Sequence, residues 1–177
     1  RRPRTSSRAS STSRACSPAA RRARGYSDRN IFIVQGNLAI TYQVLGRLED
    51  ASRIEKDVYS GRLKLSGEEH GSTLSAANNY ASSLCDLGRF EAAKSLLRES
   101  VPVARRVLGD CDESTLKMRW IYGRVLYVDA AATLNDLREA VTSLEETERS
   151  ARRILGGASP TTRSVETALR NARAALR

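Results

Sequence analysis

Few side chains in this sequence are of the types that carry catalysis or bind metals. The chain has one histidine, His70, and three scattered cysteines, Cys16, Cys85 and Cys111. An odd number of separated thiols argues against a disulfide framework or a four-thiolate zinc site, and favours a reducing compartment. The sequence contains neither a glycine-rich phosphate loop nor a Gly-x-Ser-x-Gly nucleophile motif. We therefore predict that the protein is not an enzyme and uses no metal or cofactor.

Amide and hydroxyl side chains recur at helical spacing where they could bind a peptide. Ser75, Asn78, Ser82 and Cys85 follow one another at i, i+3, i+7 and i+10, which places them on one face of a helix. An asparagine amide can donate to a peptide backbone and accept from it at the same time, so Asn78 or the adjacent Asn79 suits a peptide clamp. The alternative is that these amides hydrogen-bond a neighbouring helix and hold the packing.

Two cations and two aromatic rings repeat these offsets farther along the chain. Lys117, Trp120, Arg124 and Tyr127 would share a helix face, and together they would suit an acidic or aromatic-containing peptide. In the alternative interpretation, Trp120 belongs to the core and both cations are solvated surface charges. The corresponding face near the start of the chain contains Gln43.

The elements that must position these side chains form an internal repeat. A shift of 42 residues aligns Leu45-Gly46-Arg47 with Leu87-Gly88-Arg89, and Ser72-Thr73-Leu74 with Ser114-Thr115-Leu116. A third copy needs a longer shift of 47 residues. Periods of this length are typical of solenoids and other repeat arrays. The predicted repeats span residues 31–71, 72–113 and 114–160.

The apolar pattern within each repeat predicts two helices. In residues 31–45, Leu38 and Tyr42 belong to an apolar stripe, and Gly46 ends the helix as glycine does where φ is positive. A second stripe predicts a helix over residues 48–65. Small residues on the two helices of each hairpin would let them approach closely. They are Ala39, Ala81 and Gly123 on the first helices, and Ala51, Ala93 and Ala140 on the second.

Local signals set further expectations for the ends of the helices. Ser72 and Ser114 are plausible N-caps, and Pro102 inside a predicted second helix should kink or break it. Pro160 suits the start of a last helix over residues 161–177. The polar outer face of this helix would cap the array. The fold class is therefore an all-α solenoid of about three helical hairpins and a C-terminal capping helix.

The positive charge is concentrated at the beginning of the chain. The formal net charge is +10, but residues 1–29 hold nine arginines against one acidic residue, which leaves +2 for the remainder. This Arg/Ser-rich segment has no aliphatic side chain larger than alanine before Tyr26, so we predict that it is disordered and that residues 30–177 form the folded domain. The segment also has the composition of an organelle transit peptide, or of an arm that kinases could phosphorylate.

These repeats resemble a known family. The pattern Asn-x-Ala, Leu-Gly-Arg-x-Glu-x-Ala and Gly-x-x-His-x-x-Thr-Leu is similar to tetratricopeptide repeats of the kinesin light chain kind. The period alone would also fit HEAT-type repeats. The resemblance implies a concave groove, lined by the first helix of each hairpin, that takes an extended peptide. It also implies that the groove asparagines contact the ligand, which adds Asn37 to Asn78 and Asn79.

The function predicted from these observations is a scaffold that binds an extended, acidic peptide segment of a partner protein. The candidate groove residues are Asn37, Gln43, Asn78, Asn79, Ser82, Lys117, Trp120, Arg124 and Tyr127. Two alternatives remain open: a nucleic-acid-associated protein that binds through residues 1–29, and a structural fragment of a longer repeat protein. We expect a cytoplasmic location, or an organelle if the N-terminal segment is a transit peptide, and no membrane association.

Overall fold

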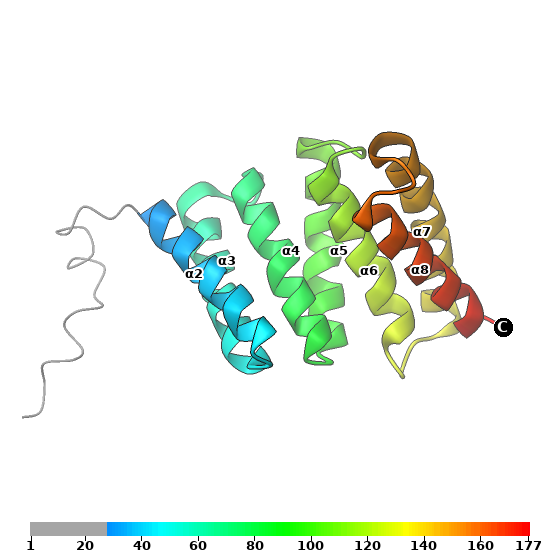
Figure 1. Cartoon of the computed structure of the whole chain (residues 1–177), viewed down its shortest axis with the longest axis horizontal. Helices are drawn as coiled ribbons and strands as arrows, with labels where there is room; N and C mark the ends of the chain where they lie inside the picture. Colours follow the sequence, from blue (N-terminus) through cyan, green and yellow to red (C-terminus); the bar gives the residue numbers. More distant parts are fainter. Residues whose placement is uncertain (1–27) are drawn as a thin grey trace, which may run out of the picture.

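The computed structural model describes residues 28–177, and every regular element in this part of the chain is a helix. The helices follow one another as a row of antiparallel pairs (Figure 1). They are α2 (Asp28–Val44), α3 (Leu48–Ser66), α4 (Gly71–Asp86), α5 (Phe90–Val107), α6 (Glu113–Val128), α7 (Leu134–Leu155) and α8 (Pro160–Ala175). The predicted all-α solenoid of three hairpins and a capping helix is confirmed. The predictions made for the N-terminal segment fall on residues outside the described range, apart from the first residues of α2.

Each helix packs against the next one along the chain, and first helices also pack on one another across the row. α4 contacts α6, and α6 contacts α8, whereas α2 and α4 have no Cα atoms within 8 Å of each other over their described lengths. The face formed by α2, α4, α6 and α8 lies on one side of the array, with α3, α5 and α7 on the other (Figure 1). None of the helices in residues 28–177 combines the length and apolarity needed to cross a bilayer.

Glycine ends the first helix in two of the three hairpins, as the sequence predicts. Gly46 and Gly88 have φ of +73° and +71°, a conformation that side chains with a Cβ rarely adopt. The next residue then donates its N–H back into the helix, as Arg89 does to the carbonyl of Leu84 at 2.8 Å. The third hairpin has no such glycine. Its second helix begins instead with a capping box, in which Thr133 and Asp136 exchange hydrogen bonds.

The expected N-caps were wrong, and the break that Pro102 could cause does not occur. The N-caps are His70 and Asp112, two residues before the predicted Ser72 and Ser114. In each case the side chain of the cap accepts the N–H of that serine, at 3.1 Å and 2.8 Å respectively. α5 continues through Pro102 without interruption.

The core consists of two apolar clusters that meet at α6. One cluster joins α4, α5 and α6, the other joins α6, α7 and α8, and the half-buried Trp120 and Tyr122 touch both. The alanines predicted at the helix crossings are fully buried. In the third hairpin, the close contact opposite Gly123 is Leu144, whose side chain would lie 2.6 Å from a Cβ at that position. In α2, by contrast, Ala39 is the one fully buried residue among residues 30–44.

Candidate peptide-binding groove

A groove of about 270 Å³ runs across the face formed by the first helices. Every one of α2, α4, α6 and α8 contributes residues to it, and α3 contributes one. The lining residues are Ile40, Gln43, Glu55, Asn78, Asn79, Ser82, Lys117, Trp120, Ile121, Pro160, Thr161 and Ser164. Because the helices stack in a row (Figure 1), residues far apart in the sequence face a common space.

The structure brings six of the nine predicted groove residues together. These six are Gln43, Asn78, Asn79, Ser82, Lys117 and Trp120. The other three predicted residues do not line the groove. Asn37 is exposed on α2, Arg124 pairs with Asp86 at the edge of α4, and Tyr127 packs against the cluster between α6 and α8. The predicted residues lie on helices, as their spacing requires. Spacing alone, however, does not determine which face of a helix turns toward the groove.

The side chain of Asn78 is the most distinctive polar group in the groove. Its Oδ1 atom is shielded from solvent, and it accepts no hydrogen bond from any described residue. A buried amide oxygen without a donor carries a cost of about 1–3 kcal/mol. An N–H group from a ligand would remove this cost once the Asn78 side chain turns Oδ1 toward the groove, because the atom has almost no solvent-accessible surface as it stands. Asn79 and Ser82, on the same helix, add an exposed amide and a hydroxyl to the groove lining.

Both cations predicted to attract an acidic peptide have an acidic partner within the chain. The Nζ atom of Lys117 lies 2.8 Å from Glu113 one turn earlier on α6. The guanidinium of Arg124 lies 3.1 Å from Asp86. Lys117 is exposed, and an exposed pair of this kind contributes little free energy, so this lysine can exchange its partner for a ligand carboxylate.

Trp120 combines the two roles that the sequence left open. The indole is half-buried and packs against both core clusters, and it also forms part of the groove wall. Its neighbour Ile121 is buried and lines the same space. The groove therefore offers an apolar floor that is continuous with the protein core.

A buried carboxylate that sequence reasoning missed lies at the α2 end of the groove. Glu55 of α3 is 4% exposed and accepts hydrogen bonds from Ser83 Oγ and Gln43 Nε2. Gln43 Nε2 also donates to Ser83 Oγ at 2.9 Å, so α2, α3 and α4 meet at this polar cluster. Burial raises the pKa of Glu55 to about 7, because the charged form loses its hydration. The signal was in the sequence, since Glu55 lies in register with the buried Ala51 and Val58.

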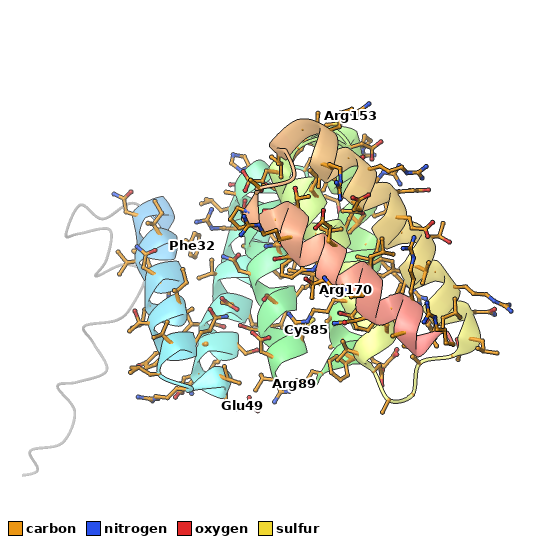
Figure 2. The ribbon with its side chains drawn as sticks, turned by 45° about the vertical axis from the view of Figure 1, so that its right-hand side comes forward. Phe32, Glu49, Cys85, Arg89, Arg153 and Arg170 are labelled. Atoms are coloured by element: carbon orange, nitrogen blue, oxygen red, sulfur yellow. The ribbon has the colours of Figure 1, made fainter. Side chains whose placement is uncertain are left out.

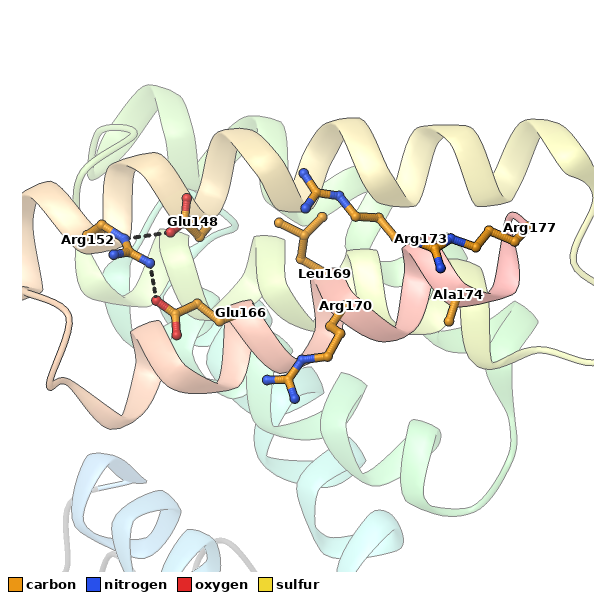
Figure 3. Close-up of a pocket in the computed structure, with 8 residues that line it drawn as sticks. All are labelled: Glu148, Arg152, Glu166, Leu169, Arg170, Arg173, Ala174 and Arg177. Atoms are coloured by element: carbon orange, nitrogen blue, oxygen red, sulfur yellow. Dashed lines mark hydrogen bonds and ion pairs between the residues drawn. The ribbon is translucent and has the colours of Figure 1, made fainter.

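A larger cleft of about 560 Å³ lies between α7 and α8 (Figure 3). Charged side chains dominate its wall, and much of this charge is already paired. Arg152 bridges Glu148 at 2.7 Å and Glu166 at 2.6 Å, as the dashed lines show, and Arg173 pairs with Glu145 at 2.8 Å. This cleft lacks the buried unpartnered amide oxygen that marks the groove on the other face.

The fold and the groove define the class of protein: a solenoid of α-helical hairpins with a groove across the face of its first helices. A family model of the tetratricopeptide repeat matches residues 34–71 and 73–114. These two segments are tetratricopeptide repeats, and the array has the fold of kinesin light chain-like repeat proteins. The resemblance to tetratricopeptide repeats of the kinesin light chain kind is thus confirmed. The alternative of HEAT-type repeats finds no support in this match.

Solved structures extend this likeness to most of the chain. The structure of a putative kinesin light chain with nearly identical TPR-like repeats from Podosopora anserina has a TM-score of 0.68 at 22% identity. A second crystal structure, of a substituted form of that protein, gives 0.70 at 22% identity, and in both cases the match covers 88% of this chain and 72% of the other. BtubC (BKLC) from P. vanneervenii gives 0.65 at 17% identity, over 85% of this chain and 62% of its own. A comparison of the sequence with curated proteins gives no match.

Proposed function

We propose that this protein is a non-catalytic scaffold that binds an extended peptide segment of a partner protein in the groove across α2, α4, α6 and α8. The observation that carries the proposal is the buried, unpartnered Oδ1 of Asn78 in a groove that every first helix lines. Tetratricopeptide repeats support a role in protein–protein interaction in general. The shape supports the extended peptide, because the groove runs across successive helices.

The chemistry of the groove suits a peptide backbone flanked by apolar side chains. The Asn78 carboxamide can accept a backbone N–H through Oδ1 and donate its NH₂ to a backbone carbonyl. Ile40 and Trp120 offer apolar contact for side chains of the ligand. The volume of about 270 Å³ lies below the range of roughly 300–1,000 Å³ typical of small-molecule pockets, which favours a few side chains of a longer chain.

The preference for an acidic ligand rests on Lys117 alone. Arg124 lies outside the groove, so it does not contribute to this preference. At the opposite end of the groove, Glu55 would disfavour a ligand carboxylate once it ionises, above its pKa of about 7. We therefore propose that an acidic residue of the ligand lies over α6 and that the segment over α2 is uncharged or basic.

The test is a selection of binders from a random peptide library displayed on phage, against the full chain. The selected peptides are then measured by fluorescence anisotropy against Asn78→Ala and against Asn37→Ala, an asparagine outside the groove. We expect Asn78→Ala to weaken binding at least about tenfold, a loss of about 1.4 kcal/mol, and Asn37→Ala to leave it unchanged. Circular dichroism melts check that both variants fold.

Two outcomes would overturn the proposal. If the selected peptides bind Asn78→Ala as tightly as the unaltered protein, the groove is not the binding site. If the selection gives no peptide that binds the folded chain, the scaffold function itself fails. Lys117→Ala then tests the charge preference, because it should weaken only peptides that carry an acidic residue.

A further inference from the structure

The outward face of α2 carries more of the exposed large apolar side chains than any other helix within residues 28–177. Six of the large apolar side chains that are more than two-fifths exposed belong to this helix and the residue that follows it, and Val44 is 82% exposed. They are Ile33, Val34, Leu38, Ile40, Val44 and Leu45, of which Ile40 lies at the border with the groove. The helix lies at one end of the row, and among residues 28–177 its backbone packs against α3 alone (Figures 1 and 2). A cluster of exposed apolar side chains at the end of a repeat array is a candidate interaction surface.

The same face carries no charge. Residues 30–46 contain no Asp, Glu, Lys, Arg or His, although the whole chain has a formal net charge of +10. The centre of the exposed face contains the uncharged Asn37 and Thr41, and the Thr41 hydroxyl already donates to the Asn37 carbonyl at 3.1 Å. Two copies of this surface can therefore meet without the repulsion that the rest of the chain would produce.

The sequence before α2 does not have the apolar pattern of a repeat helix that would cover this face. In a solenoid, the second helix of a preceding repeat would pack here, and the 42-residue period places it at residues 6–24. Those residues contain arginine, serine, threonine, alanine, one cysteine and one proline, and no aliphatic side chain larger than alanine. They lack the apolar stripe that such a helix needs.

The opposite end of the array does not match this face either. The exposed surface of α8 carries Arg163, Arg170 and Arg177, whereas Arg173 turns toward Glu145 of α7. Head-to-tail stacking would place these guanidinium groups against the apolar side chains of α2, and their desolvation would oppose the contact. A self-complementary contact between two α2 helices avoids this cost, because each copy then buries apolar surface against apolar surface.

We infer that two copies of this chain associate through a two-fold symmetric contact in which α2 packs against α2. In such a contact the two helices cross side by side, and Val34 and Val44 of each copy become buried. The contact is about one helix wide and about 25 Å long, so its area falls near the low end for specific interfaces, about 1,000 Å² in total. The dimer therefore dissociates on dilution in the micromolar range.

The test is sedimentation velocity on the full chain over a concentration series from about 1 to about 500 μM. We expect the mass to rise from 19.5 kDa to twice this value across the series. The double variant Val34→Glu/Val44→Glu should stay monomeric, with a dissociation constant raised at least about tenfold, because two charges per copy enter the contact. Val34→Lys/Val44→Lys should do the same, which separates loss of apolar contact from the sign of the charge.

The matched control is Leu134→Glu/Ile154→Glu, since both side chains are large, apolar and about half or more exposed on α7. It should dimerise as the unaltered chain does. A monomer at every concentration would overturn the proposal. A dimer that the α2 variants do not weaken, or one that Arg163→Glu/Arg170→Glu dissociates, would also overturn it by moving the contact away from α2.

Discussion

The two ends of the array differ in how they finish the solenoid. At the C-terminal end, α8 buries Val165, Ala168 and Ala172 against its neighbours and turns arginines outward. At the other end, α2 buries Ala39 and leaves most of its aliphatic side chains exposed. A terminal helix closes a repeat array only if one face is apolar and the other polar. The comparison shows that α8 is a cap, whereas α2 is a repeat helix with an open side.

The ends also differ in how they join the middle of the array. α8 packs directly on α6 through apolar side chains. α2 has no comparable backbone approach to α4, and the polar cluster of Gln43, Glu55 and Ser83 links them instead. The α2 end is therefore held in part by hydrogen bonds around a titratable group, so its stability should depend on pH in a way that the α8 end does not.

The largest expected effect comes from removing the charge of Glu55 in the polar cluster that links α2 to α4. The folded protein keeps the proton of Glu55 up to a pKa of about 7, while the unfolded chain releases it near its ordinary value of 4.5. The free energy of unfolding should therefore fall as pH rises through this window, by about 3 kcal/mol in total from this group. Glu55→Gln cannot ionise, so it should flatten this part of the profile and be more stable than the unaltered protein above pH 7.

Urea denaturation on both sides of this window measures the effect. Glu49→Gln, an exposed acid on the same helix, is the control and should keep the dependence of the unaltered protein. If Glu55→Gln lowers the free energy of unfolding equally at all pH values, Glu55 acts as a hydrogen-bond acceptor only, and its ionisation does not affect stability in this pH range.

Two glycine-to-alanine substitutions compare the tight packing around α6 with the open packing around α2. A Cβ on Gly123 would lie 2.6 Å from Leu144 Cγ, whereas a Cβ on Gly36 of α2 would meet no atom within 4 Å among the described residues. Gly123→Ala should therefore lower the free energy of unfolding by about 2 kcal/mol through overpacking. Gly36→Ala should raise it by about 0.5–1 kcal/mol, because alanine favours the helix.

Thermal or urea denaturation of the two variants checks the sign as well as the size. Equal effects at both positions would mean that α2 is packed as tightly as α6, which would contradict the comparison of the two ends.

The smallest expected effect concerns two ion pairs. Lys94 of α5 and Asp136 of α7 lie 2.6 Å apart with side chains 14% and 13% exposed, so Lys94→Met removes the cation from a carboxylate that, among the described residues, keeps only its hydrogen bonds from Thr133. We expect a loss of about 1 kcal/mol in urea denaturation. The Arg47–Asp50 pair beside α2 is much more exposed, and Arg47→Met should give no measurable change. A larger loss from Arg47→Met than from Lys94→Met would reverse the expected order.

Much of the fold could be predicted because its signals are local. The Leu-Gly-Arg turns depend on glycines that must adopt positive φ, and the apolar stripes repeat in register with them. The N-caps were misplaced by two residues because a histidine and an aspartate compete with nearby serines for the same role. The continuous α5 shows that tertiary packing outweighs the local effect of Pro102.

The groove was harder to predict because it depends on contacts between distant residues. Arg124 is drawn to Asp86, 38 residues earlier in the chain, and nothing in its own helix indicates this partner. Asn78 was found because its chemistry and its helical offset agree. Glu55 was missed because a single acidic residue in an apolar stripe does not indicate its partners. These are the Ser83 hydroxyl and the Gln43 amide, which donate hydrogen bonds to its carboxylate.

α8 both caps the array and forms part of the groove, which limits how the array can change in length. Pro160, Thr161 and Ser164 at the beginning of this helix form one side of the groove. Shortening the chain before α8 would remove a wall of the site together with the cap. Duplicating a hairpin between α7 and α8 would lengthen the groove by one helix and separate Lys117 and Trp120 from that wall. Repeat gain in this protein would therefore change the length and the lining of the groove, even if every existing side chain were kept.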